Sequence, residues 1–68
     1  MAVVNMIGEI LKKRGIKQAW LAEQVGLTRS TMSNLINNRH QTNIDIAFKI
    51  ADILDMKIYE IFIYKRDS

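Results

Sequence analysis

Residues 17–37 read KQAWLAEQVGLTRSTMSNLIN, a pattern of two short helices joined by a tight turn. Apolar residues recur on one side of a helix that runs from about Lys17 to Val25, and Gly26 can adopt the positive φ that ends it. Thr28 suits the N-cap of the next helix, which ends near Asn37, because its hydroxyl can accept from an amide of the first turn. The segment therefore predicts two helices separated by only a few residues.

The helix expected over residues 28–37 has two unlike faces. At about 100° per residue, its polar side chains gather on one side, and these are Arg29, Ser30, Ser33, Asn34 and Asn37. Its apolar side chains lie largely opposite, and these are Met32, Leu35 and Ile36. A solvated helix face usually mixes both signs of charge, whereas this polar face has no acid. Arg, Asn and Ser can pair with base edges in the major groove, so the face is suited to duplex DNA.

A plainer interpretation of this polar face stays open on these residues alone. Ser and Asn have weak helix propensity and are often simple surface residues. The preceding helix and its glycine turn favour the DNA-binding interpretation, because that pair is the geometry by which a helix enters the major groove.

The rest of the chain predicts three more helices and an all-α fold. We expect Asn5 to cap a first helix of about ten residues that ends before Gly15. A fourth helix is expected from about Asn43 to Leu54, opened by Thr42 or Asn43. Its core side is expected to carry Ile44, Ala47, Ile50, Ala51 and Leu54. The segment 58–64 suits either a helix or a strand, and we favour a short helix that ends in an extended tail.

Length and charge set limits on the class of protein. With 68 residues there is room for one domain, residues 1–68, with the C-terminal helix and tail at 57–68. The segment Ile10–His40 holds six basic residues and one acid, or +5, and residues 41–68 hold four basic and five acidic residues, or −1. An uneven distribution of this kind fits a surface that contacts phosphates, and it also fits a basic solvated surface.

Several classes of function lack the residues that they require. The chain has no cysteine and a single histidine, His40, so we expect neither a metal site nor a cofactor. No glycine-rich phosphate loop follows a strand, and His40 has no evident catalytic partner, so we expect no enzyme and no small-molecule ligand. No run approaches the roughly 18 apolar residues of a membrane span, and no export signal is evident. These features favour a cytoplasmic protein.

Over about Ile7–Phe62 the chain resembles the phage Cro and repressor family of helix-turn-helix proteins, also called the XRE family. The motifs that carry the resemblance are Gln18-Ala19-Trp20-Leu21-Ala22, Val25-Gly26-Leu27-Thr28, Ser30-Thr31-Met32-Ser33-Asn34-Leu35 and Lys49-Ile50-Ala51. The resemblance implies a lambda-repressor-like bundle of about five helices, with the third helix in the major groove. The residues that it implies face bases are Arg29, Ser30, Ser33 and Asn34. The expected contacts to the DNA backbone are Lys17, Gln18, Thr28, Asn37, Asn38, Arg39 and His40.

The chain departs from the family pattern at a few positions. Leu11 and Ile36 stand where the family often has a buried Arg–Glu pair, and an apolar contact there is often neutral or stabilising. Asn38 and Asp55 stand where Gly is common, and both residue types tolerate left-handed backbone. Lys57 replaces the usual Ser or Thr cap, so we expect the last helix to be poorly started.

Apolar residues in the second half exceed the needs of one helix face. We expect a self-complementary dimer patch formed by Ile46, Ile53, Tyr59, Ile63 and Tyr64, although a wider buried arc would also explain them. Trp20 is expected to pack over the domain edge, with a partner-binding role as the alternative. The function predicted is a transcriptional regulator, a repressor that binds a pseudo-palindromic operator as a homodimer. The alternative is an antitoxin or other protein-binding module with secondary DNA binding. The protein partner considered is RNA polymerase for a regulator or a toxin for an antitoxin.

Overall fold

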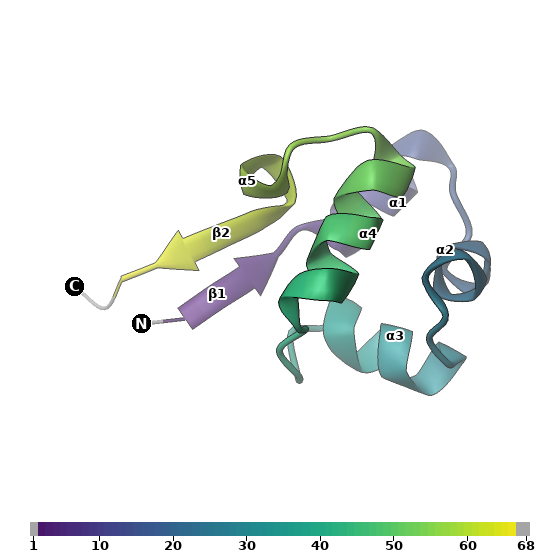
Figure 1. Ribbon diagram of the computed structural model, residues 1–68, viewed down its shortest axis with the longest axis horizontal. Helices are drawn as coiled ribbons and strands as arrows, with labels where there is room; N and C mark the ends of the chain where they lie inside the picture. The colour runs from purple at the N-terminus through teal and green to yellow at the C-terminus, as the bar shows by residue number, and fades with distance from the viewer. Residues whose placement is uncertain (1, 67–68) are drawn as a thin grey trace.

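The computed structural model describes residues 2–66 as five helices and two short strands (Figure 1). In chain order they are β1 (Ala2–Asn5), α1 (Ile7–Arg14), α2 (Gln18–Val25), α3 (Arg29–Ile36), α4 (Ile44–Leu54), α5 (Ile58–Ile61) and β2 (Phe62–Lys65). The four longer helices form the body of the molecule. The two strands extend from it along the longest axis, which accounts for overall dimensions of 36 × 22 × 22 Å.

One apolar core joins all five helices. Its members are Ile7, Leu11, Leu21, Ala22, Val25, Met32, Leu35, Ile50, Ala51, Leu54 and Ile61. The most deeply buried include Ile7, Leu21, Met32, Ile50 and Ile61, each with 0% of its surface exposed. Burying one such side chain contributes about 1.5–3 kcal/mol relative to leaving it in water. The core therefore fixes how α3 sits against the other helices.

The helix ends expected from the sequence are confirmed at most positions. Gly15 and Gly26 end α1 and α2 with φ of 68° and 81°. The Thr28 hydroxyl accepts from the Thr31 amide at 3.1 Å and so caps α3. At α4 the choice between two candidate caps is settled, because the Asn43 side chain accepts from the Ile46 amide at 2.9 Å.

The starts of α1 and α5 differ from expectation. The N-cap of α1 is Met6, not Asn5. Asn5 ends β1 instead, although its side-chain oxygen still accepts from the Ile7 amide at 3.2 Å. At α5 the Glu60 carboxylate accepts from the Lys57 amide at 2.9 Å. The Glu60 side chain thus pairs the amide of the N-cap residue, and the Glu60 amide, which a Ser or Thr cap would bind, donates to the Lys57 carbonyl at 2.9 Å instead.

The all-α expectation is wrong at the two ends of the chain. β1 and β2 form an antiparallel pair, with Ala2 opposite Lys65 and Asn5 opposite Phe62. The tail that suited either helix or strand contains one of each, because α5 is followed directly by β2. The N-terminal strand was not expected. Its partner lies about as far away in the sequence as the chain allows, so local patterning carries no sign of the pairing.

The outer side of α4 also differs from expectation. Ile44 was expected in the core but is 69% exposed, and Phe48, one turn later, is 58% exposed. Ile46 and Ile53 are half-buried and pack against the core. The wider buried arc is therefore the better description of those two residues. The apolar residues of α4 that remain exposed to solvent are Ile44 and Phe48.

Helix α1 lies close to the end of α3. Leu11 belongs to the core and Ile36 packs against it, as expected for apolar residues at these two positions. A Cβ atom built on Gly8 would lie only 2.9 Å from Cγ2 of Ile36. Glycine at position 8 therefore allows the two helices to approach this closely.

Candidate nucleic-acid interface

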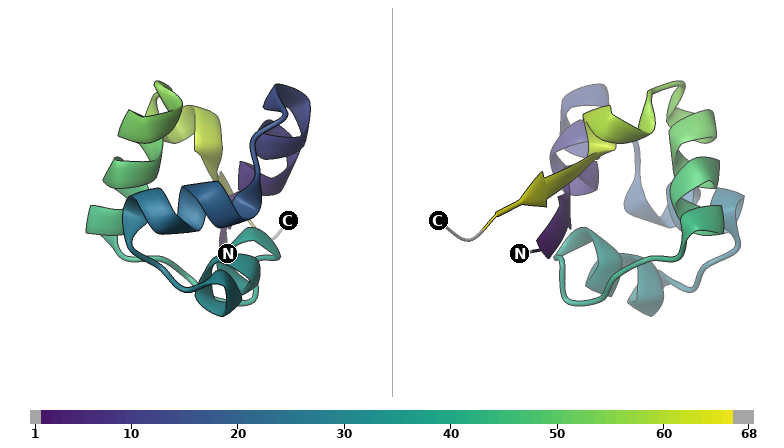
Figure 2. Two further views of the ribbon diagram at one scale, coloured as in Figure 1. Left: turned by 90° about the vertical axis from the view of Figure 1, so that its right-hand side faces the viewer. Right: turned by 60° about the vertical axis from the view of Figure 1, so that its left-hand side comes forward.

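Three residues, Gly26 to Thr28, turn the chain from α2 into α3. After the left-handed Gly26, the Leu27 amide donates to the Ala22 carbonyl at 2.9 Å, and Leu27 packs against the core. Figure 2 (left) shows α2 running across the molecule, with α3 beneath it at the end of the bundle. A short turn of this kind between two packed helices is the helix-turn-helix arrangement.

The two faces of α3 are separated as the sequence predicts. Met32 and Leu35 are buried, at 0% and 4% exposure. The four residues expected to face bases lie on the other side, with Arg29 and Ser30 exposed and Ser33 and Asn34 half-buried. No Asp or Glu occurs between Glu23 and Asp45, so neither α3 nor the loop that follows it carries a negative side chain.

Asn34 is bonded to the loop that follows α3. The Arg39 amide donates to the Asn34 carbonyl at 2.9 Å, and the Arg39 guanidinium donates to the Asn34 side-chain oxygen at 3.4 Å. To recognise adenine, an asparagine must use both its oxygen and its NH₂ group. The bond to Arg39 uses one of the two lone pairs of the Asn34 side-chain oxygen.

Two of the expected backbone contacts already cap α3. The Asn37 side chain donates to the Ser33 carbonyl at 2.9 Å, as the Asn37 amide also does at 3.0 Å, so this residue closes the last turn with two bonds. The Thr28 hydroxyl accepts from the Thr31 amide and donates to the Thr31 hydroxyl at 2.9 Å. Both side chains are exposed, but each has a structural role before any DNA arrives.

The other expected backbone contacts lie on both sides of α3. Lys17 and Gln18 are exposed at the start of α2, and Arg39 and His40 are exposed in the loop after α3. Asn38 differs from these four residues, because its side chain is hydrogen-bonded to Asn5. Sequence reasoning missed this role of Asn5, the buried polar residue of the core region, at 7% exposure.

Only part of the basic charge of the first half lies near α3. The Arg14 guanidinium donates to the Leu54 carbonyl at the C-terminal end of α4. That end of α4 lies at the top of Figure 1, whereas α3 lies at the bottom. Lys12 and Lys13 share the last turn of α1 with Arg14, where positive charges interact favourably with the helix dipole. The cations at the start of α2, on α3 and in the loop after α3 are Lys17, Arg29 and Arg39.

The predicted dimer patch is divided in two. Ile46 and Ile53 pack against the core of their own chain. Tyr59, Ile63 and Tyr64 are 69%, 39% and 56% exposed. The exposed part of the patch thus lies on α5 and β2 rather than on α4.

Two other kinds of site, a metal centre and a membrane span, have no counterpart among the residues that the structure describes. Residues 2–66 bring together no group of three or more His, Cys, Asp or Glu side chains that could hold a metal ion. Within the same range, every helix is too short or too polar to cross a membrane. Trp20, which was expected to pack over the edge of the domain, lies on α2 with 46% of its surface exposed, so it is only partly packed.

Comparison with known proteins agrees with this geometry. Residues 6–67 match the family model of the Cro/C1-type HTH DNA-binding domain. An uncharacterized HTH-type transcriptional regulator of Methanothermobacter thermautotrophicus is 38% identical over 65 residues, which cover 94% of each chain. A second one, from Methanocaldococcus jannaschii, is 35% identical over 53 residues, or 78% of this chain and 80% of the relative.

Solved structures share the fold. The crystal structure of a Bacteroides fragilis protein designated as DNA-binding superposes with a TM-score of 0.83 at 28% identity, covering 90% of this chain and 98% of that one. A Listeria innocua transcriptional regulator superposes with a TM-score of 0.78 at 18% identity, over 91% of this chain and 58% of its own, and this likeness concerns the fold alone. On the strength of the family match, which spans nearly the whole sequence, the chain belongs to the Cro/C1-type helix-turn-helix DNA-binding family.

Proposed function

We propose that this protein represses transcription as a homodimer that binds a pseudo-palindromic operator, with α3 of each subunit in the major groove. The single observation that carries the proposal is the polar, acid-free face of α3 opposite the buried Met32 and Leu35. Membership of a DNA-binding regulator family supports the same role. A bound dimer would act by occupancy, because it excludes polymerase from the DNA that it covers.

Each side chain on this surface has a proposed role that follows from its chemistry. Arg29 is suited to the O6 and N7 atoms of guanine and Asn34 to the N6 and N7 groups of adenine, whereas Ser30 and Ser33 accept several bases. The proposed phosphate contacts are Lys17, Gln18, Thr28, Asn37, Asn38, Arg39 and His40. Arg39 has two roles in this scheme, because it is also bonded to Asn34.

A dimer is proposed because a single copy offers only a small surface for contact with DNA. Two copies related by a twofold axis would place their α3 helices about 34 Å apart, one turn of DNA. Tyr59, Ile63 and Tyr64 are the exposed apolar residues proposed for the contact. Sedimentation at micromolar concentration is expected to show a dimer, and a strict monomer would remove this part of the proposal.

The test of DNA recognition compares two variants on two kinds of duplex. Sites are first selected from a random pool, and affinity is then measured for a selected and an unrelated duplex over a series of salt concentrations. Asn34→Ala is expected to cost about 1–3 kcal/mol on the selected site and to relax the choice of base there. Lys17→Ala is expected to weaken both duplexes alike and to reduce the salt slope by about 1. Equal effects of both variants on every sequence would contradict the assigned roles.

A protein-binding role is the second candidate. The observation in its favour is the exposed pair Ile44 and Phe48 on α4, together with the half-exposed Trp20. The same salt series separates the two functions. A module whose DNA contact is secondary would bind all duplexes with similar affinity. A repressor binds its preferred sequences at least about a thousandfold more tightly than it binds unrelated duplexes.

A further inference from the structure

We propose that Asn5 is a positioning residue for DNA recognition, which acts through Asn38 to fix the loop that follows α3. The inference rests on the proposed DNA-binding role of α3 and adds a residue that cannot itself reach DNA, because Asn5 is buried. We call the hydrogen-bonded pair Asn5 and Asn38 the asparagine clasp.

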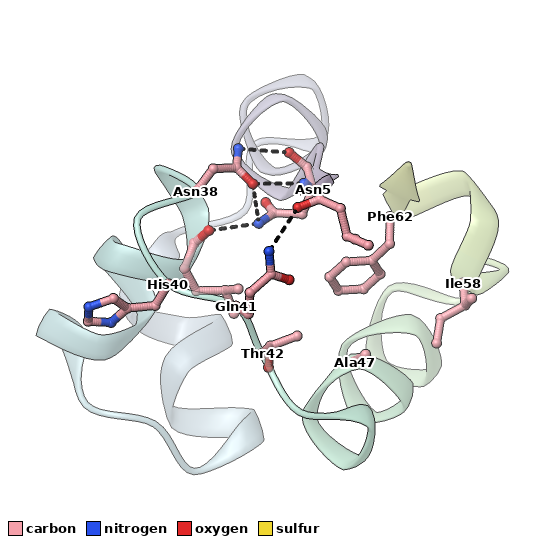
Figure 3. A pocket seen from close by; sticks show the side chains of 10 residues that line it. Asn5, Asn38, His40, Gln41, Thr42, Ala47, Ile58 and Phe62 are labelled. Carbon is pink, nitrogen blue, oxygen red and sulfur yellow. Dashed lines mark hydrogen bonds between the residues drawn. The ribbon is translucent and has the colours of Figure 1, made fainter. Parts of the chain in front are cut away.

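The clasp connects β1 to the C-terminal end of α3 by several bonds (Figure 3). The Asn5 side-chain nitrogen donates to the Leu35 carbonyl at 2.7 Å and to the Asn38 side-chain oxygen at 3.0 Å. The Asn5 amide donates to the same Asn38 oxygen at 2.9 Å, and the Asn38 side-chain nitrogen donates to the Asn5 carbonyl at 3.4 Å. The loop is thereby joined to a strand 33 residues earlier in the sequence.

Asparagine is the residue type that this position requires. The Asn5 side chain uses two N–H donors, and its oxygen accepts from the Ile7 amide at 3.2 Å. A carboxylate offers no donor, a hydroxyl offers one, and an apolar side chain would leave the Leu35 carbonyl with fewer partners. A buried polar side chain whose groups are all paired favours one arrangement of the chain over others.

Packing alone does not hold the loop in place. A pocket of about 250 Å³ lies between the loop and the sheet, lined by Asn5, Asn38, Gln41 and apolar side chains that include Phe62. Side chains beside such a pocket lack the close contacts that fix a core. The loop position therefore depends on hydrogen bonds. The amides of residues 38–40 donate to carbonyls of the last turn of α3, and the clasp and a bond from the Gln41 side chain to the Val3 carbonyl at 3.4 Å join the loop to β1.

The loop carries groups that the proposed interface needs. Arg39 is bonded to Asn34 through both backbone and side chain, so a displaced loop would release the Asn34 side chain as well. The imidazole of His40 points away from Asn5 in Figure 3, toward the outside of the loop. With the clasp intact, these groups are already arranged before DNA binds, which lowers the ordering cost of the complex.

The experiment uses a glycine substitution that leaves the backbone unstrained. Asn38 has φ of 58°, a conformation that glycine adopts freely, so Asn38→Gly removes the clasp without forcing the chain. Asp55→Gly is the matched control, because Asp55 has φ of 53° and ends α4, outside the clasp. Asn5→Ala and the double variant Asn5→Ala with Asn38→Gly complete the set.

We expect the clasp variants to lose affinity for the selected duplex on the order of tenfold, the worth of one net hydrogen bond. In Asn5→Ala, affinity for an unrelated duplex and the salt slope should stay near those of the parent. Asn38→Gly also removes a proposed phosphate contact, so it should lose some affinity for both duplexes, with the larger loss on the selected one. The double variant should bind the selected duplex no more weakly than the single variant with the lower affinity, since both substitutions remove the same connection. Asp55→Gly should bind like the parent, and thermal melting checks that each variant is folded.

Two results would overturn the inference. One is a folded Asn38→Gly variant that binds the selected duplex like the parent or like Asp55→Gly. The other is an equal loss on both duplexes from Asn38→Gly with none from Asn5→Ala, because Asn38 would then act only as the proposed phosphate contact and independently of Asn5.

A measurement without DNA separates this inference from the proposed function. Hydrogen exchange of the Arg39 amide is expected to be about tenfold faster in Asn38→Gly than in the parent, and unchanged in Asp55→Gly. An unchanged exchange rate would overturn the inference that the clasp fixes the loop, even if DNA binding is confirmed. Failure of the parent protein to prefer any duplex would instead reject the proposed function and leave the clasp supported by the exchange result.

Discussion

The helix-turn-helix and the two-stranded sheet are specified over very different distances along the chain. The turn between α2 and α3 is set by Gly26 and Thr28, which act on backbone within a few residues of themselves. The sheet instead pairs Ala2 with Lys65, and neither strand has a partner until both ends of the chain have folded back. A unit built from local signals can be predicted from its own sequence, whereas a unit built from the chain ends depends on everything between them.

The two regions also differ in what they bury. Residues of α2 and α3 supply five members of the core, namely Leu21, Ala22, Val25, Met32 and Leu35. In the sheet, Val3, Ile63 and Tyr64 remain 39–56% exposed. We therefore expect the free energy of unfolding to depend much more on the first region than on the second, and three experiments test this order.

The largest effect is expected from a substitution in the core of the helix-turn-helix. Met32 is fully buried in α3, so Met32→Ala removes apolar contacts and leaves a cavity. We expect the free energy of unfolding to fall by about 2–5 kcal/mol, measured by urea denaturation followed by circular dichroism. Protein concentration must be the same for all variants, because a dimer would gain stability with concentration.

Met32→Leu is the control for that substitution. It nearly conserves volume and should cost less than about 1.5 kcal/mol. If Met32→Ala cost no more than Met32→Leu, the core around α3 would be loosely packed, and the difference between the two regions would disappear.

The sequence predicted the elements whose signals are local. Gly15, Gly26 and Thr28 gave the ends of helices correctly, and the alternation of Met32 and Leu35 with polar residues gave the orientation of α3. These residues act through φ, through one capping bond and through helical period, all of which are visible in a short window.

Other features depended on contacts that no short window contains. The helical period of α4 suits several angles of approach, and the packing of its neighbours decided that Ile46 and Ile53 face inward while Ile44 faces water. Asn5 looked like a helix cap because a cap is the commonest local use of asparagine before a helix. Its actual partners, Leu35 and Asn38, lie 30 and 33 residues away.

An intermediate effect is expected where α1 meets α3. A methyl group at Gly8 would lie 2.9 Å from Cγ2 of Ile36, an atom close to the α3 backbone that cannot swing away freely. Overpacking of this kind costs about 1–3 kcal/mol, and the better helix propensity of alanine returns up to about 1 kcal/mol. We expect Gly8→Ala to lower the free energy of unfolding by about 1–2 kcal/mol in the same urea assay.

The partner residue supplies the check on that result. In an Ile36→Ala background the clash is absent, so Gly8→Ala should become neutral or stabilising, and the two substitutions should be non-additive. Additive losses would mean that Gly8 matters for some reason other than its approach to Ile36.

The smallest effect is expected in the sheet. Val3 and Tyr64 are directly opposite each other on β1 and β2, and a cross-strand pair of this type is worth about 0.2–1 kcal/mol relative to two alanines. A double-mutant cycle with Val3→Ala and Tyr64→Ala, measured by urea denaturation, should return a coupling energy in that range. Val4 points to the opposite face of the sheet, so Val4→Ala and Tyr64→Ala should add independently. A coupling energy between Val3 and Tyr64 as large as the loss in Met32→Ala would contradict the ranking, because the sheet would then stabilise the protein as much as the core does.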